Sequence, residues 1–225
     1  MLREVLHHGL SSRAAKPLVF VLCLMPAGWL MVGAATHQLG ANPAEALIRA
    51  TGDWSLRLLC VALAVTPLRL FLRLPGLARF RRMLGLYVYF YAAVHLLCYA
   101  WFDMGFVLQD MVRDIAKRPF ILVGFVGVLL LTPLALTSFH AAVRWLGSAR
   151  WQALHRLVYA VAPLAVLHFF WMRSGKNDFS EVALYAGILS ALLGARLWHR
   201  VAGQGRRPWI KRAPQAEPLR SKSMD

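Results

Sequence analysis

Six apolar stretches, separated by short polar segments, dominate the hydrophobic pattern of the chain. A helix rises about 1.5 Å per residue, so ~20 apolar residues are enough to cross a hydrocarbon core of ~30 Å. The pattern therefore predicts an all-α fold, a polytopic membrane bundle of six transmembrane helices. The stretches cover about residues 17–36, 54–72, 83–102, 120–137, 154–172 and 182–198.

Composition agrees with a membrane location and gives the bundle an orientation. Hydrophobic residues make up 59% of the chain, against roughly 45–50% in a soluble domain. The net charge of +16 would suggest a nucleic-acid partner for a soluble protein, but in a membrane protein it is typical of cytoplasmic loops. With the N-terminus inside, 16 of the 26 basic residues fall in inner segments and 6 in outer loops. We therefore expect a lipid bilayer around the chain, no nucleic acid, and both termini in the cytoplasm.

The apolar stretches and the short segments between them fill the chain up to about residue 200, and we expect one transmembrane domain over residues 1–201. Residues 202–225 are rich in Arg, Lys, Pro and Ser, which predicts a basic, disordered cytoplasmic tail. The first stretch follows basic residues as a signal peptide does, but its length favours an uncleaved helix. The sequence has no Walker loop and no Gly-rich dinucleotide motif, so a nucleotide-binding or catalytic domain is expected on another chain.

Three of the eight histidines lie within apolar stretches, where an ionisable side chain is expensive. His95 in the third stretch and His168 in the fifth lie ~18 and ~21 Å along helices that run in the same direction. They should therefore lie at similar depth, in the outer half of the bilayer. Imidazole readily ligates haem iron, and a helix bundle can shield the porphyrin from water. The pattern predicts that His95 and His168 are axial ligands of a haem.

His155, the third of these histidines, lies near the inner boundary of the membrane and is harder to place. On an ideal helix the 13 residues between His155 and His168 leave the two side chains about 140° apart. The two side chains share a face only if the helix deviates, for example at Pro163. The third stretch offers no obvious partner at the depth of His155, so one haem and two haems both remain open.

Other readings of these residues compete with haem ligation. A histidine in a membrane helix can simply hydrogen-bond a neighbouring helix, or it can relay protons in a transporter. Transporters normally have acids at mid-membrane, whereas every Asp and Glu here is expected in a loop or at a helix end. Arg81 and Arg82 immediately precede the third stretch, where they either set the topology or contact an anion such as a flavin phosphate or a haem propionate.

An ordered series of short motifs makes the chain resemble the MsrQ (YedZ) family, within the ferric-reductase-like transmembrane group. The family comprises haem-binding membrane subunits of the bacterial periplasmic methionine-sulfoxide reductase system. The resemblance covers about residues 50–172. The motifs are AVTPLR at 64–69, RRMLGL at 81–86, YAAVH at 91–95, KRPFI at 117–121, LALTS at 134–138, WQALHRLVY at 151–159 and HFFW at 168–171.

The resemblance implies a function in the bacterial inner membrane that spacing alone does not give. The family carries b-type haem, with FMN as a further cofactor, and its haem histidines correspond to His95, His155 and His168. It takes electrons from the respiratory quinone pool and passes them to a periplasmic, molybdopterin-containing subunit that reduces methionine sulfoxide in oxidised proteins. Larger relatives place two histidines on each of two helices, whereas this third stretch has one, so their two-haem arrangement does not transfer whole.

We therefore expect a haem-binding electron carrier that serves a sulfoxide reductase without performing the sulfoxide chemistry itself. Two alternatives remain at this point. One is a haem-free transporter or proton-coupled permease. The other is a stand-alone metal reductase of the ferric-reductase type, which would need a separate electron donor.

Overall fold

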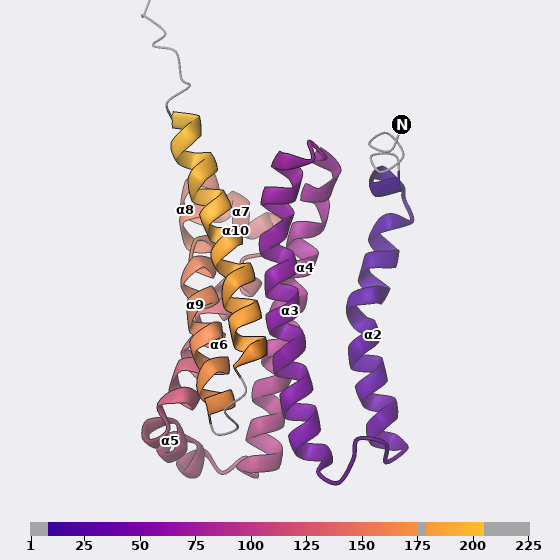
Figure 1. The fold of residues 1–225 in the computed structure, drawn as a ribbon, viewed down its shortest axis with the longest axis vertical. Coiled ribbons are helices and arrows are strands. Elements are labelled where there is room, and N and C mark those ends of the chain that lie inside the picture. The colour runs from indigo at the N-terminus through magenta and orange to yellow at the C-terminus, as the bar shows by residue number, and fades with distance from the viewer. Residues whose placement is uncertain (1–8, 175–178, 205–225) are drawn as a thin grey trace, which may run out of the picture.

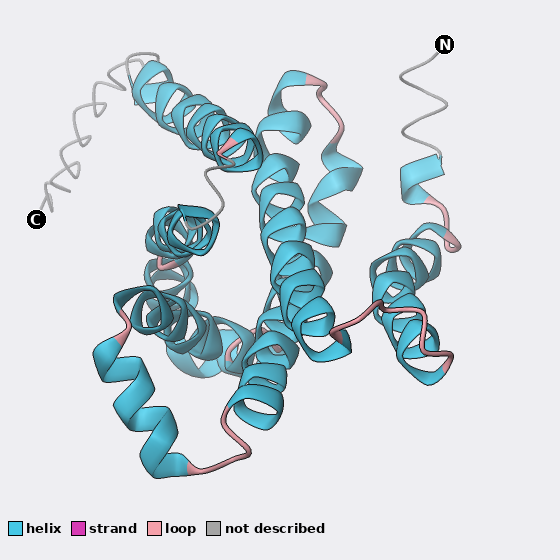
Figure 2. Ribbon diagram, turned by 60° about the horizontal axis from the view of Figure 1, so that its bottom comes forward, coloured by secondary structure: helices cyan, strands magenta, loops and turns pink. Residues whose placement is uncertain are grey.

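The computed structural model describes residues 9–174 and 179–204, which form helices and short loops without a strand (Figures 1 and 2). Six segments are long and apolar enough to cross a membrane, which confirms the predicted all-α bundle. The tail expected at 202–225 lies almost wholly outside the described residues. The helices are α2 (Ala15–Ala35), α3 (Pro43–Phe71), α4 (Arg81–Cys98), α5 (Leu108–Lys117), α6 (Pro119–Leu136), α7 (His140–Leu146), α8 (Ser148–His155), α9 (Val158–Ser174) and α10 (Ser180–Gln204), with a 3-10 turn at Pro75–Phe80 and a π-helical turn at Tyr99–Asp103.

Successive long helices run in opposite directions, so the bundle has two ends. We call inner the end at which α3 finishes and α4 begins, because the basic loops predict that it faces the cytoplasm. Helix α2 begins and α10 ends at this inner end, and α5 lies at the outer end (Figure 1). Helix α4 packs along α3 and α9 along α6, and the core lies between these two pairs.

Helix α3 begins at Pro43, well before the apolar stretch that predicted it. The side chain of Asn42 accepts a hydrogen bond from the backbone N–H of Glu45 at 3.1 Å, and Pro43 occupies the first helical position. An Asn cap, a Pro at the first position and an acid in the first turn all stabilise a helix start, even in a polar segment. Asp53 is therefore inside a helix, and the expectation that every acid lies in a loop or at a helix end is wrong.

Helix α2 stands at one side of the bundle and is held there mainly by α3 and α4 (Figure 1). The Tyr91 hydroxyl donates to the carbonyl of Cys23 at 2.8 Å and accepts from the N–H of Ala27 at 3.1 Å. Pro26 lies between these two residues and removes a donor from the helix. Tyr91, at 1% exposure, therefore satisfies α2 backbone groups beside its proline.

Two polar segments expected to be loops contain helices, and the fifth span is interrupted in an unexpected place. Helix α5 was hidden because its apolar residues recur at helical spacing over only ten positions. Helices α7 and α8 similarly occupy the loop expected at 138–153. The fifth span breaks at residues 156–157, between α8 and α9, whereas Pro163 lies inside the continuous helix α9. The break separates His155 from the helix that carries His168.

Candidate functional site

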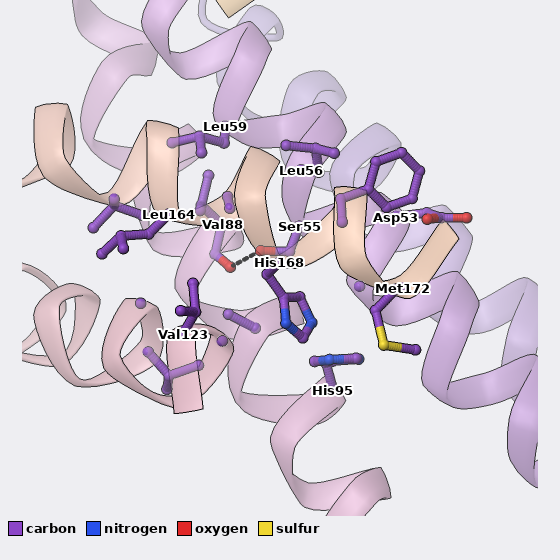
Figure 3. Close-up of a pocket in the computed structure, with 18 of the residues that line it drawn as sticks. Asp53, Ser55, Leu56, Leu59, Val88, His95, Val123, Leu164, His168 and Met172 are labelled. Carbon is purple, nitrogen blue, oxygen red and sulfur yellow. Dashed lines mark hydrogen bonds between the residues drawn. The ribbon is translucent and has the colours of Figure 1, made fainter. Parts of the chain in front are cut away.

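The side chains of His95 and His168 meet between the two helix pairs, as the matched depths predicted. Their ring centroids are 6.1 Å apart and their planes are inclined by 76°. His95 comes from α4 and His168 from α9, and the two rings lie next to each other at a cavity that both line (Figure 3). In the described part of the chain, no group of three or more His, Cys, Asp or Glu residues could hold a metal ion by itself.

The imidazole of His95 is fixed by the backbone of α3. Its Nδ1 lies 2.8 Å from the carbonyl oxygen of Ile48. Gly52 follows one turn later, and a Cβ added there would lie 3.2 Å from Cε1 and Nδ1 of the imidazole. The ring therefore lies against bare backbone, which a larger residue at position 52 would crowd.

The imidazole of His168 is fixed by α6 in the same way. Its Nδ1 lies 2.7 Å from the carbonyl oxygen of Phe120, and a Cβ added at Gly124 would lie 2.8 Å from Cε1 and Nδ1 of the ring. On each side, a carbonyl is followed four residues later by a glycine. Helices α3 and α6 thus provide matching cradles for the imidazoles carried by α4 and α9.

These hydrogen bonds determine which ring nitrogen is available to a ligand. A backbone carbonyl can only accept, so the proton of each neutral imidazole is on Nδ1. Each Nε2 then keeps its lone pair and can ligate a metal. Metal-bound histidines typically donate their other N–H to a carbonyl or a carboxylate in this way, which fixes the tautomer and the ring orientation.

The separation of the two rings fits an iron atom between them. A first-row metal ion sits about 2 Å from each ligating imidazole nitrogen, and each ring centroid is about 1 Å behind that nitrogen. Two axial imidazoles should therefore have centroids about 6 Å apart, close to the observed 6.1 Å. The donor set of two neutral imidazoles is one that haem iron accepts. The residues present fit a haem, which His95 and His168 would hold through their imidazoles.

The cavity beside these rings has a volume of ≈ 170 Å³ and lies between α3, α4, α6 and α9. Most of its walls are apolar, which suits a planar hydrophobic group that must be kept from water. Charged side chains also line it: Arg49 and Asp53 on α3, and Arg173 on α9 (Asp53 is labelled in Figure 3). Arg49 pairs with Glu45 and Arg173 with Glu181, whereas Asp53 has neither an ion pair nor a hydrogen bond within the described residues.

Several residues of this site were not foreseen from the sequence. Ile48 and Phe120 act through backbone carbonyls, which carry no side-chain signal. Gly52 and Gly124 could have been noticed, because a glycine in a transmembrane helix often marks a close approach of another group. Asp53 was expected in the outer loop at 37–53 because the start of α3 was placed too late.

His155 is not part of this pair. It ends α8 at the inner end of the bundle, its Nδ1 lies 3.0 Å from the carbonyl of Trp151, and its ring stacks on the Trp151 ring at 3.9 Å. A second cavity, of ≈ 550 Å³, lies here. Arg81 lines this cavity and Arg82 does not. The lining residues are Thr66, Leu70, Arg81, Trp151, Gln152, His155, Arg156, Tyr159, Arg196 and His199.

Comparisons with known proteins agree on one family. The family described as "Ferric reductase like transmembrane component" matches residues 51–166. The chain is 63% identical over 194 residues to a protein of Polaromonas naphthalenivorans (strain CJ2), covering 86% of this chain and 89% of that one. It is 51% identical over 188 residues to a protein of Ralstonia nicotianae, covering 84% and 87%, and 43% identical over 197 residues to one of Caulobacter vibrioides, covering 88% and 90%.

All three relatives carry the name "Protein-methionine-sulfoxide reductase heme-binding subunit MsrQ". No solved structure matches the chain. The similarity extends over most of the chain and includes the segments that carry the paired histidines and their glycine cradles.

Proposed function

We propose that this chain, a member of the MsrQ family of heme-binding subunits, binds b-type haem and carries electrons across the bacterial inner membrane. The family is of the ferric-reductase-like type, and the six apolar helices make the chain a multi-pass membrane protein. In this proposal the electrons come from the respiratory quinone pool. They leave to a periplasmic, molybdopterin-containing subunit that reduces methionine sulfoxide in oxidised proteins. The chain itself does not contact the sulfoxide.

The observation that carries the proposal is the matched pair of imidazole cradles. His95 and His168 lie with their ring centroids 6.1 Å apart, and each is held by a backbone carbonyl and a glycine on a different helix. The hydrogen bond from each Nδ1 to a neighbouring helix would also serve packing alone, but neither Nε2 has a hydrogen-bond partner among the described residues. Two neutral imidazoles held at the spacing of axial ligands are instead pre-organised for a metal.

The chain's own residues hold, orient and insulate the proposed haem. Haem iron supplies a one-electron carrier when it is bound. His95 and His168 ligate it, and the carbonyls of Ile48 and Phe120 keep the imidazoles in the required tautomer. The apolar residues of the cavity exclude water from the site. His95 is three residues before the end of α4, so the pair lies toward the outer end, which suits delivery of electrons to a periplasmic partner.

Three further roles are proposed: one for His155 and one for Arg81 at the inner end of the bundle, and one for FMN. His155 is proposed as a further ligand because its Nε2 is buried without a hydrogen-bond partner among the described residues. Arg81 is proposed as an anion contact because it lines the same cavity. FMN is proposed as a second cofactor from the family alone.

The test is a spectrum of the purified full-length chain with two histidine variants. Oxidised and dithionite-reduced spectra should differ as b-type haem does, and a pyridine haemochrome assay should give the haem content per chain. His95→Ala and His168→Ala should each lose the haem held by the pair. His140→Ala is the matched control, because His140 is exposed on α7 and lines neither cavity. The two substitutions are also combined in one chain. If this double variant retains as much haem as the wild type, the assignment of His95 and His168 as haem ligands is wrong.

A proton-coupled permease is a second candidate, and Asp53 is the observation that favours it. An acid inside a transmembrane helix, lining a cavity with two histidines, is an arrangement that proton relays use. This candidate predicts a colourless purified protein and proton flux in liposomes that Asp53→Asn abolishes. Haem bound in proportion to the chain would exclude it as the primary function.

A further inference from the structure

Helix α5 has an apolar stripe that the rest of the bundle covers only in part. The stripe consists of Leu108, Met111, Val112 and Ile115. Their three- and four-residue spacing places them on one side of the helix. Met111 and Ile115 are half-buried, whereas Leu108 is 71% and Val112 59% exposed. The polar side of the helix carries Gln109, Asp110, Arg113 and Lys117.

A hydrogen bond to the end of α4 fixes how α5 is turned about its own axis. The Tyr99 hydroxyl donates to Oδ2 of Asp114 at 2.7 Å, and Asp114 also pairs with Arg118 at 2.9 Å. Two residues turn a helix by about 200°, so Val112 faces nearly the opposite way from Asp114. While Tyr99 holds Asp114, Val112 cannot turn into the bundle, and whatever covers it must lie outside the described helices.

The neighbouring segment places α5 at the outer boundary of the bilayer. Only Arg118 separates Lys117, the last residue of α5, from the membrane-spanning helix α6, which begins at Pro119 with an apolar first turn. Helix α5 runs across the long helices at this end of the bundle rather than along them (Figures 1 and 2). Its ten residues cover ~15 Å, about half of a hydrocarbon core. The helix therefore lies where the core meets water.

The uncovered stripe continues the lipid-facing surface of the transmembrane helices. Leu97 is exposed within the α4 span, and Trp101 follows it one helical turn later, also exposed. The Trp101 ring lies 6.1 Å from the exposed ring of Phe106, which is two residues before Leu108. Aromatic side chains are enriched where membrane proteins meet the headgroups. An apolar surface thus leads from the α4 span through two aromatic rings to α5.

We propose that α5 is an interfacial helix, which lies in the outer surface of the bilayer with Leu108 and Val112 in contact with lipid. Amphipathic helices of this kind bury their apolar side at the boundary of headgroups and acyl chains and keep the polar side in water. Lipid fits the stripe better than a periplasmic protein does, because the stripe continues the lipid-facing surface and lies at its level. This inference rests on α5 and its neighbours and does not depend on the proposed haem.

The experiment is site-directed spin labelling of the full-length chain in vesicles of phosphatidylethanolamine and phosphatidylglycerol. The three native cysteines are replaced by alanine, so that each variant carries one label. Leu108→Cys and Val112→Cys place a nitroxide on the stripe. Gln109→Cys and Arg113→Cys are the matched controls, because both residues are exposed on the polar side of the same helix. Collisions of each label are measured with oxygen, which concentrates in lipid, and with a nickel chelate, which stays in water.

We expect labels on the stripe to collide more often with oxygen than with the chelate, and labels on the polar side to show the reverse. Four water-exposed labels, or four lipid-exposed labels, would overturn the proposal. A second measurement keeps the native cysteines and places a photocrosslinking residue at Leu108 or Val112 in living cells. Lipid adducts support the proposal, whereas a protein adduct at either position would show that a periplasmic partner covers the stripe and would overturn it.

Discussion

Replacing Gly124 by Ala tests the imidazole cradle directly, because it adds one methyl group where the His168 ring lies. The added Cβ would be 2.8 Å from both Cε1 and Nδ1 of His168 and 3.3 Å from its Cγ. Carbon and nitrogen atoms in ordinary contact lie about 3.5–4 Å apart, so the ring must move by several tenths of an ångström. Helix α9, which carries His168, is packed along α6 and cannot simply retreat.

The movement should disturb ligation more than it disturbs folding. Overpacking of this kind costs about 1–3 kcal/mol. The same displacement draws Nδ1 from the Phe120 carbonyl and turns Nε2 away from the position of an axial ligand. A loss of that size corresponds to about 5–150-fold weaker haem binding. Gly52→Ala is the milder case, since its Cβ would lie 3.2 Å from the His95 ring.

The chain offers a matched control on the same helix. Gly127 lies three residues after Gly124 and lines the same cavity, but a Cβ added there meets nothing within 4 Å. Haem retention and haemin titration of the three variants should give the order Gly127→Ala, near wild type, then Gly52→Ala, then Gly124→Ala. If Gly124→Ala and Gly127→Ala bind haem equally well, the cradle does not position the ligand and the reasoning is refuted.

Three other substitutions follow from the same structure. Tyr91→Phe removes two hydrogen bonds to the α2 backbone and should lower the free energy of unfolding by about 1–3 kcal/mol. Thiol labelling of Cys23 should become faster, and unchanged thermal unfolding would contradict this prediction. Asn42→Ala removes the cap of α3 and should cost about 1 kcal/mol in thermal or denaturant unfolding, whereas Asn42→Ser should restore most of it. Asp53→Asn removes a negative charge from the cavity that His95 and His168 line, so it should raise the midpoint potential of the proposed haem, whereas Asp110→Asn on α5 should not. Equal potentials would show that Asp53 does not face the haem.

The transmembrane framework could be predicted because the bilayer imposes it. Each span needs ~20 apolar residues, and all six apolar stretches correspond to helices of the bundle. The same regular rise placed His95 and His168 at one depth, and their rings do meet. The depth of a residue in the bilayer follows from the number of residues between it and the end of its helix, so it could be predicted from the sequence.

What could not be predicted depends on packing between distant segments or on signals weaker than hydropathy. The carbonyls of Ile48 and Phe120 come from helices that carry neither histidine, so their role requires the tertiary structure. The early start of α3 was signalled by Asn42, Pro43 and Glu45, but a search for apolar stretches does not register caps. Arg81 and Arg196 both line the inner cavity, although they are far apart in the sequence and lie on different helices, α4 and α10.

The central claim is that His95 and His168 together ligate one haem, and chemical rescue of His168→Gly tests it most directly. Low-temperature electron paramagnetic resonance of the oxidised wild type should show the low-spin signal of iron with two imidazole ligands. In His168→Gly that signal should be replaced by a high-spin one, and added imidazole should restore it by entering the space that the side chain leaves. An unchanged low-spin, two-imidazole signal in His168→Gly without added imidazole would contradict the account.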